Sequence, residues 1–165
     1  MPSSGAVTDA RDLLERANLV DVGCFELSGQ RGAAVESGRK IVGPGPAQDL
    51  ELENEAHELG VYWLSGGGRL LVRLLIALKS NAGDLRVGMQ AEWDMGDLSR
   101  DDVPADVEEE FVNRVAVMTL VPYLRAGISD LASRILGVSV TMSLIRPGDL
   151  EFTSLRGDAP AEVAG

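Results

Sequence analysis

The single histidine, His57, is the first candidate for chemistry, because an imidazole can act as a general base or bind a metal near neutral pH. It lies in an acidic stretch, and we interpret it as a solvated surface side chain. The carboxylates of that stretch are of the type that binds hard cations, but they lack the Asp/Asn/Gly loop spacing of a calcium site. One solvated face of a strand explains them better. They are Glu51, Glu53, Glu55 and Glu58.

The other reactive residue types also lack the neighbours that chemistry requires. Cys24, the only cysteine, lies in a predicted strand with no second histidine to activate it, so we expect a buried core thiol. The glycines at 66–68 do not have the order of a phosphate-binding loop. Trp63 and Trp93 fall on apolar faces, where core packing is the default. The sequence therefore predicts a protein that is not an enzyme and has no metal site.

The composition narrows the class of partner. The chain has 165 residues and a formal net charge of -11, from 26 acidic and 15 basic residues, so general electrostatics disfavour nucleic acid and anionic membranes. A basic or unfolded polypeptide is a better partner for such a surface, although acidity can serve solubility alone. One cysteine, no uninterrupted apolar run of about 18 residues and no signal peptide at the N-terminus predict a cytoplasmic protein.

The longest helical pattern runs from Val107 to Leu136, with apolar residues at i, i+3 and i+4 spacing. Acidic residues crowd its first turns, and Gly137 follows its last periodic residue, where a left-handed cap ends a helix. Pro122 lacks a backbone donor and predicts a kink or two abutting helices. We expect the ring of Tyr123 to be buried, with its hydroxyl hydrogen-bonded.

Four strands are predicted before that helix, at residues 18–27, 49–59, 69–79 and 84–95, with a long crossing loop at 28–48. The third and fourth are joined by the turn residues 80–83 and alternate clearly between two faces. The order predicts an α+β fold, a four-stranded antiparallel sheet with a long, Pro-kinked helix packed on one face. We assign 1–17 to a flexible N-terminus with a short helix at 10–17, 18–155 to a single domain, and 156–165 to a disordered acidic tail.

Several segments together resemble the SecB export chaperone family, over roughly Leu19 to Leu150. The most specific is LVPYLR, Leu120–Arg125, followed by GISDLASRILGVSVTMSL. DLELE at 49–53, RLLVRLLIAL at 69–78 and MQAEWDM at 89–95 are similar to the family's second, third and fourth strands, in the same order.

The resemblance implies a homotetramer, a dimer of dimers, that uses no cofactor and holds unfolded client polypeptides in apolar grooves, for protein export. The client-binding residues that it implies are Ile41, Val42, Leu50, Leu52 and Trp93. The residues expected to pack one dimer against another are Leu85, Val87 and Met89.

The chain also departs from the family. The family docks the SecA motor through acids on its first and fourth strands; Asp21 and Glu26 match the first, but Arg86 stands at the fourth-strand position. This difference puts SecA docking in doubt, so a SecB-like chaperone dedicated to a toxin–antitoxin system is a second hypothesis. A small-ligand-binding α+β protein, with Trp63 and Trp93 lining a closed pocket, is a third hypothesis. A purely structural oligomer subunit is a fourth.

Overall fold

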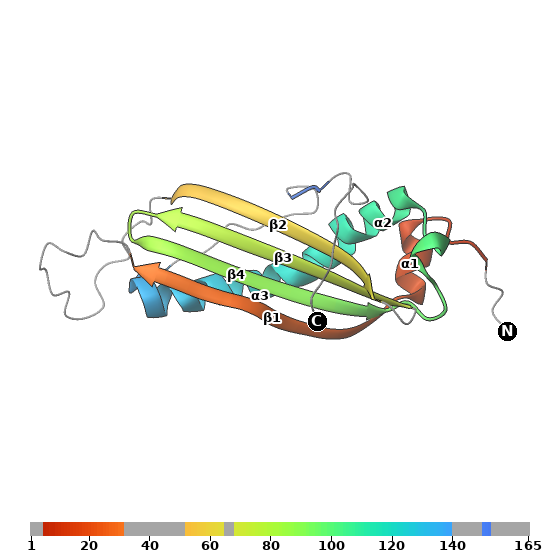
Figure 1. The fold of residues 1–165 in the computed structure, drawn as a ribbon, viewed down its shortest axis with the longest axis horizontal. Coiled ribbons are helices and arrows are strands. Elements are labelled where there is room, and N and C mark those ends of the chain that lie inside the picture. Colours follow the sequence, from red (N-terminus) through yellow and green to blue (C-terminus); the bar gives the residue numbers. More distant parts are fainter. Residues whose placement is uncertain (1–4, 32–51, 65–67, 140–149, 153–165) are drawn as a thin grey trace, which may run out of the picture.

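This computed structural model describes residues 5–31, 52–64, 68–139 and 150–152. The strands form one antiparallel sheet in the order β1-β4-β3-β2, with the long helix behind it (Figure 1). The predicted α+β class, sheet and helix are therefore confirmed. The elements are α1 (Ala10–Arg16), β1 (Asn18–Arg31), β2 (Leu52–Leu64), β3 (Arg69–Ser80), β4 (Gly83–Asp94), η2 (Arg100–Asp102), α2 (Ala105–Phe111), η3 (Val112–Ala116), α3 (Val117–Leu131) and η4 (Ala132–Leu136).

The strands β3 and β4 form the centre of the sheet. Both alternate as the sequence predicts, and the row of each that faces the helix is buried. Ser80 pairs with Gly83 across the hairpin turn, and the Ser80 hydroxyl donates to the Gly83 carbonyl at 2.6 Å. Gly83 has a φ of 145°, a conformation that side chains disfavour, which is why the turn needs a glycine there.

The two outer strands differ from the sequence prediction in length. β1 continues to Arg31, because residues 28–31 stay in register with the start of β4 instead of entering a loop. β2 continues to Leu64, so it includes the segment 61–64 that the sequence left unplaced. The rest of the predicted crossing loop, the start of the predicted second strand and the predicted tail lie outside the described residues.

The long helix is continuous from Ala105 to Leu136, close to the predicted bounds. It passes through Pro122 without ending, and its irregular segments are the π-helical turns η3 and η4, so the prediction of two abutting helices at the proline is wrong. Gly137 ends it in the left-handed conformation, with φ 68°, as predicted. By length and composition alone this helix, within the described residues, could cross a membrane. Its apolar side is packed against the sheet, which is the behaviour of a core helix.

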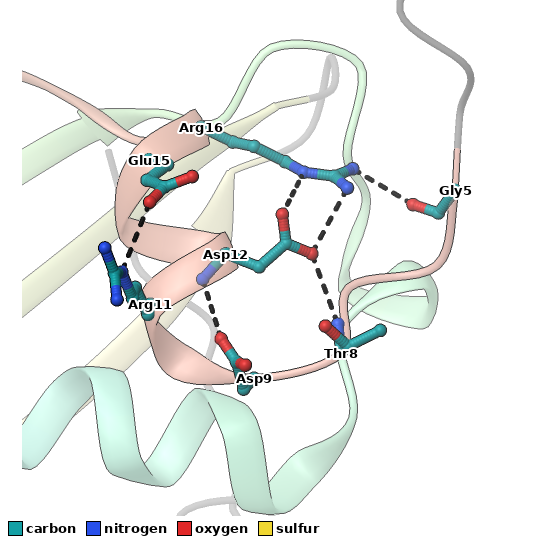
Figure 2. Close-up of polar contacts among 7 residues, drawn as sticks. All are labelled: Gly5, Thr8, Asp9, Arg11, Asp12, Glu15 and Arg16. Atoms are coloured by element: carbon teal, nitrogen blue, oxygen red, sulfur yellow. Dashed lines mark hydrogen bonds and ion pairs between the residues drawn. The ribbon is translucent and has the colours of Figure 1, made fainter.

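The predicted N-terminal helix is present as α1, and it packs against α2. The side chain of Asp9 accepts the backbone N–H of Asp12 at 2.8 Å, which caps the first turn (Figure 2). Asp12 in turn accepts two hydrogen bonds from the Arg16 guanidinium, at 2.9 and 3.2 Å, and Arg16 also donates to the Gly5 carbonyl. These contacts fix the N-terminal segment, while buried Leu13 anchors the helix to the core.

Candidate polypeptide-binding and assembly surfaces

The most apolar exposed surface of the described residues is the edge strand β1. Four of its large side chains are 38% to 50% exposed: Leu19, Val20, Phe25 and Leu27. β1 pairs with β4 on one side, and among the described strands nothing pairs with its other side. A long apolar edge of this kind is a template for pairing with another chain, which proteins ordinarily prevent with charge, covering or short strands. β1 is therefore a candidate interface.

Two β-bulges put apolar residues on both faces of β1. Leu19 and Leu27 lie opposite Trp93 and Val87, so they share the helix-covered face of the sheet. The register shifts at Leu19/Asp21 and at Cys24/Glu26, which inserts Val20 and Phe25 as extra residues. Cys24 is exposed on this strand, and the prediction of a buried thiol is wrong because an edge strand has no neighbour on its outer side.

The face of the sheet away from the helix, which we call the open face, carries an aromatic–arginine cluster. Phe25 of β1 and Tyr62 of β2 both lie against the Arg73 guanidinium of β3, with ring centroids 5.0 and 5.8 Å from its central carbon. Phe25 reaches Arg73 across β4 because Gly88 has no side chain there; a Cβ on Gly88 would lie 2.5 Å from the ring. Arg73 also donates to the Gln90 side chain at 2.9 Å.

This cluster changes the expectation for the second face of the sheet. The alternation in residues 69–79 predicts a second face that is half apolar, and any strongly apolar part of it would need covering, most simply by self-association. Leu71 and Leu75, the large apolar residues of β3 on that face, are instead buried within the single chain. The cluster lies beside them, so the apolar surface that remains for a partner is along the β1 edge rather than on the open face.

The acids that match the expected SecA docking positions are placed on this open face. Glu26 is half-buried and accepts a hydrogen bond from the Arg86 Nε at 2.8 Å. The Glu26 carboxylate raises the pKa of Arg86, first through the hydrogen bond and then through its charge. Asp21 is exposed and lies opposite Glu92, which itself pairs with Arg69 at 3.0 Å. Arginine thus neutralises Glu26, one of the two acids.

The residues predicted to pack one dimer on another lie in the core. Leu85, Val87 and Met89 belong to the row of β4 that the helix α3 covers, and all three are buried. Gly127 of α3 approaches so closely that a Cβ there would lie 2.9 Å from Val87 Cγ1. Their direct role in assembly stays a prediction, but their side chains do not form a free surface, and a charge at Val87 would disturb the fold before any interface.

The predicted client-binding residues are not brought together by the described structure. Trp93 is 3% exposed and packs edge-to-face on Phe111 with ring centroids 5.7 Å apart, so it is a core residue. Ile41, Val42 and Leu50 lie outside the described residues. Leu52 begins β2 at the edge opposite β1, and its side chain is also outside the description.

Trp63 makes a contact of its own, separate from that of Trp93. The indole N–H of Trp63 donates to Oε1 of the buried Glu108 at 3.2 Å, which ties β2 to the start of the long helix. A cavity of about 450 Å³ lies elsewhere, between the N-terminal segment and the loop before α2, with Gly5, Leu98 and Val103 among its lining residues. A closed pocket lined by both tryptophans, as the small-ligand hypothesis requires, stays a prediction, and the core packing of Trp93 does not favour it.

The structure also tests the predicted burial of Tyr123 and the predicted solvation of His57. Tyr123 is 49% exposed, and the prediction of a buried ring is wrong because the buried side of α3 carries Leu120 and Leu124. His57, predicted to be a solvated surface side chain, is instead half-buried, with Nε2 3.1 Å from Glu55 Oε1 in a geometry that is not that of a hydrogen bond. Within the described ranges, no cluster of three or more His, Cys, Asp or Glu residues could hold a metal.

Sequence reasoning missed the aromatic–arginine cluster and the bulges that produce it. Its members lie on different strands, so only the register brings them together. It also missed Asn113, whose side chain bonds the backbone of Phe152. The one signal for Asn113 was an amide side chain in the interior of a helix, where asparagine is disfavoured.

The arrangement of the sheet and the long helix is similar to that of a known chaperone. The structure is similar to the SecB-like chaperone Rv1957 of Mycobacterium tuberculosis, solved in complex with a ChAD peptide from the HigA1 antitoxin, with a TM-score of 0.63. The sequences are 20% identical, and the match covers 81% of this chain and 94% of that one. The fold is SecB-like. At this identity the likeness establishes the fold, which agrees with the resemblance seen in the sequence.

A second solved structure, a protein of unknown function from Streptococcus agalactiae, is more distant. It has a TM-score of 0.43 and 9% identity, with 78% of this chain and 97% of that one covered. No protein-family model and no curated protein matches the sequence.

Proposed function

We propose that this SecB-like protein is a molecular chaperone that binds unfolded polypeptides and keeps them from aggregating. The observation that carries the proposal is the SecB-like fold. A holdase needs exposed apolar surface to bind many sequences and charge to remain in solution, and a net charge of -11 supplies the charge. The function requires neither a catalytic group nor a cofactor.

We assign the two edges of the sheet to different tasks. β1 would pair with a second copy, and two such dimers would form a tetramer, because burying exposed Leu19, Val20 and Leu27 removes the most apolar exposed side chains of β1 from water. The opposite edge, where β2 begins, would contribute to the client groove together with the predicted residues Ile41, Val42, Leu50 and Leu52. The proposed compartment is the cytoplasm, where a single cysteine remains reduced.

A dedicated client is the more specific version of this function. The solved SecB-like chaperone with the TM-score of 0.63 holds a peptide from an antitoxin. In the present chain the Glu26 carboxylate is engaged by Arg86 at 2.8 Å, which weakens the case for docking an export motor at this face. We therefore favour a toxin–antitoxin client over a role in protein export, and both uses share the same polypeptide-binding chemistry.

The experiment that tests the general function is suppression of aggregation. The purified full chain is added to a chemically unfolded client at near-stoichiometric ratio, and light scattering is followed. We expect suppression that persists at about 0.3 M salt, because apolar contacts carry the binding and are not screened. The triple variant Val42→Ser, Leu50→Ser, Leu52→Ser should lose it, while Leu14→Ser, a matched exposed leucine on α1, should not. Full activity in the triple variant would place the groove elsewhere.

Assembly is tested by size-exclusion chromatography with light scattering. Leu27→Lys places a charge on the β1 edge at a side chain that is 49% exposed, so the expected result is a smaller species with an unchanged circular dichroism spectrum. Tyr123→Ser on the outer side of α3 serves as a comparison that leaves the edge intact. A wild-type protein that is monomeric at micromolar concentration would refute the proposed assembly.

A further inference from the structure

Asn113 and Phe152 are joined by two hydrogen bonds between a side chain and a backbone. Asn113 Nδ2 donates to the Phe152 carbonyl at 2.8 Å, and the Phe152 N–H donates to Asn113 Oδ1 at 2.8 Å. The carboxamide thus bonds one residue as a neighbouring β-strand would, because it satisfies both main-chain groups of that residue at once.

The segment held in this way is extended and alternating. Leu150 and Phe152 pack against the hydrophobic core, and Glu151 between them is exposed. This is the period of a β-strand that buries one face. In Figure 1 the short blue segment at residues 150–152 lies beyond β2, on the side of the molecule away from β1. The chain therefore binds a short piece of itself as an extended peptide.

An asparagine at position 113 does not favour the helix, but it can bind the backbone of Phe152. Asparagine is disfavoured in helix interiors because its side chain competes for backbone groups. Asn113 lies in the π-helical turn η3, and here its amide bonds a backbone far away in the sequence instead of its own. Little more than one turn earlier, Glu108 bonds Trp63 near the end of β2, so this part of the helix adjoins the β2 side of the sheet, at the end of the strand opposite to Leu52.

We propose that Asn113 and the core surface beside it form a binding site for an extended polypeptide with an apolar-x-apolar pattern, occupied in the free chain by its own residues Leu150–Phe152. This rests on the proposed function, since an unfolded client is the competing occupant. The two backbone hydrogen bonds exclude proline at the Phe152 position, because proline has no N–H to donate, while the core surface favours apolar side chains at the Leu150 and Phe152 positions. The chain's own segment then acts as a competitor that lowers client affinity.

The size of the effect follows from occupancy. A ligand that needs an open site binds with an apparent Kd equal to its intrinsic Kd divided by the open fraction. If the chain's own segment fills the site in about nine of ten molecules, removing it should tighten client binding about tenfold. Weakening Asn113 should act in the opposite direction, since it removes contacts that any occupant uses.

The test uses a fluorescein-labelled peptide of residues 148–156, titrated into full-length protein and followed by anisotropy. The Phe152→Ser protein should bind it at least fivefold more tightly than wild type. Adding Asn113→Asp to that variant should weaken binding at least fivefold, because a carboxylate cannot donate to the peptide carbonyl and repels it. A peptide with proline in place of Phe152 should not compete. Phe25→Ser, which alters an aromatic residue on the other edge, should leave peptide binding at the wild-type level.

The outcomes separate this site from the general function. Equal peptide affinity in wild type and Phe152→Ser, or no dependence on Asn113, would overturn the site and leave Phe152 a packing residue only. Peptide binding as expected with no holding of unfolded client would support the site and refute the chaperone function. Client holding unaffected by Phe152→Ser and by excess peptide would refute the site and leave the function standing. If Phe152→Ser does not fold, the milder Leu150→Ala carries the same comparison.

Discussion

Gly88 is the position at which a single methyl group tests the aromatic–arginine cluster. A Cβ there would lie 2.5, 2.8 and 2.9 Å from three atoms of the Phe25 ring, all far closer than real contacts. The ring is the free end of a side chain, so Gly88→Ala should displace it from Arg73 rather than unfold the sheet.

The magnitude can be worked from the parts. Phe25 is 38% exposed, so more than half of the residue is buried, and losing that burial costs about 1 to 2 kcal/mol. Losing the contact with the guanidinium adds about 0.5 to 1 kcal/mol. Alanine in place of glycine within a strand returns about 0.5 to 1 kcal/mol. Gly88→Ala should therefore lower the free energy of unfolding by about 1 to 2 kcal/mol.

The sign should reverse when the ring is removed. In a Phe25→Ala background, Gly88→Ala meets no ring and should stabilise the protein by about 0.5 kcal/mol. Urea denaturation of the four proteins, at one fixed protein concentration because assembly shifts apparent stability, gives the coupling energy. Gly23→Ala on β1, where a Cβ meets no atom within 4 Å, is the matched control and should not destabilise. Additive effects of the two changes would refute this account of the cluster.

Three further changes have outcomes that follow directly from the structure. Gly127→Ala gains about 1 kcal/mol of helix propensity, yet it should still destabilise by about 1 kcal/mol in thermal unfolding because its Cβ would press on buried Val87 and Met89. Asp9→Ala should cost about 1 kcal/mol in urea unfolding through loss of the α1 cap, while Asp9→Ser should retain most of it. Hydrogen bonds from Ser99, first its backbone N–H and then its hydroxyl, lower the pKa of Asp102 from its ordinary 3.8, so their stabilisation is present above that pH and is lost as pH falls. In a carboxyl NMR titration, Ser99→Ala should move the Asp102 midpoint upward, towards 3.8; an unchanged midpoint would exclude the hydroxyl as a cause.

The alternation of apolar residues was sufficient to predict the centre of the sheet. In β3 and β4 every second side chain faces the helix, so the burial of Leu74 and Val87 follows from the two-residue period of a strand alone. The long helix was equally predictable, because the 3.6-residue period and Gly137 mark its buried side and its end. The edge strands were not, since among the described strands β1 has no second neighbour and its length depends on pairing with β4 rather than on its own residues.

The candidate sites were predicted far less well than the fold. Trp93 and Tyr123 are both aromatic, but one is in the core and the other on the surface because of the direction in which each strand or helix position points. Phe25 meets Arg73 only because a bulge turns it and a glycine on the intervening strand leaves room. Asn113 bonds a residue 39 positions away. Such pairings depend on three-dimensional register, which a local pattern does not contain.

The strand order also has a consequence during synthesis on the ribosome. β1 is translated first among the strands, but its partner β4 begins only at Gly83, after β2 and β3 have been made. Domains form as units while the chain grows at about 5 to 20 residues per second, so β1 emerges several seconds before it can be paired. The nascent chain therefore displays Leu19, Val20, Phe25 and Leu27 without any partner strand during that interval. A protein that we propose shields the apolar segments of other chains is, in its own first seconds, a chain in need of the same protection.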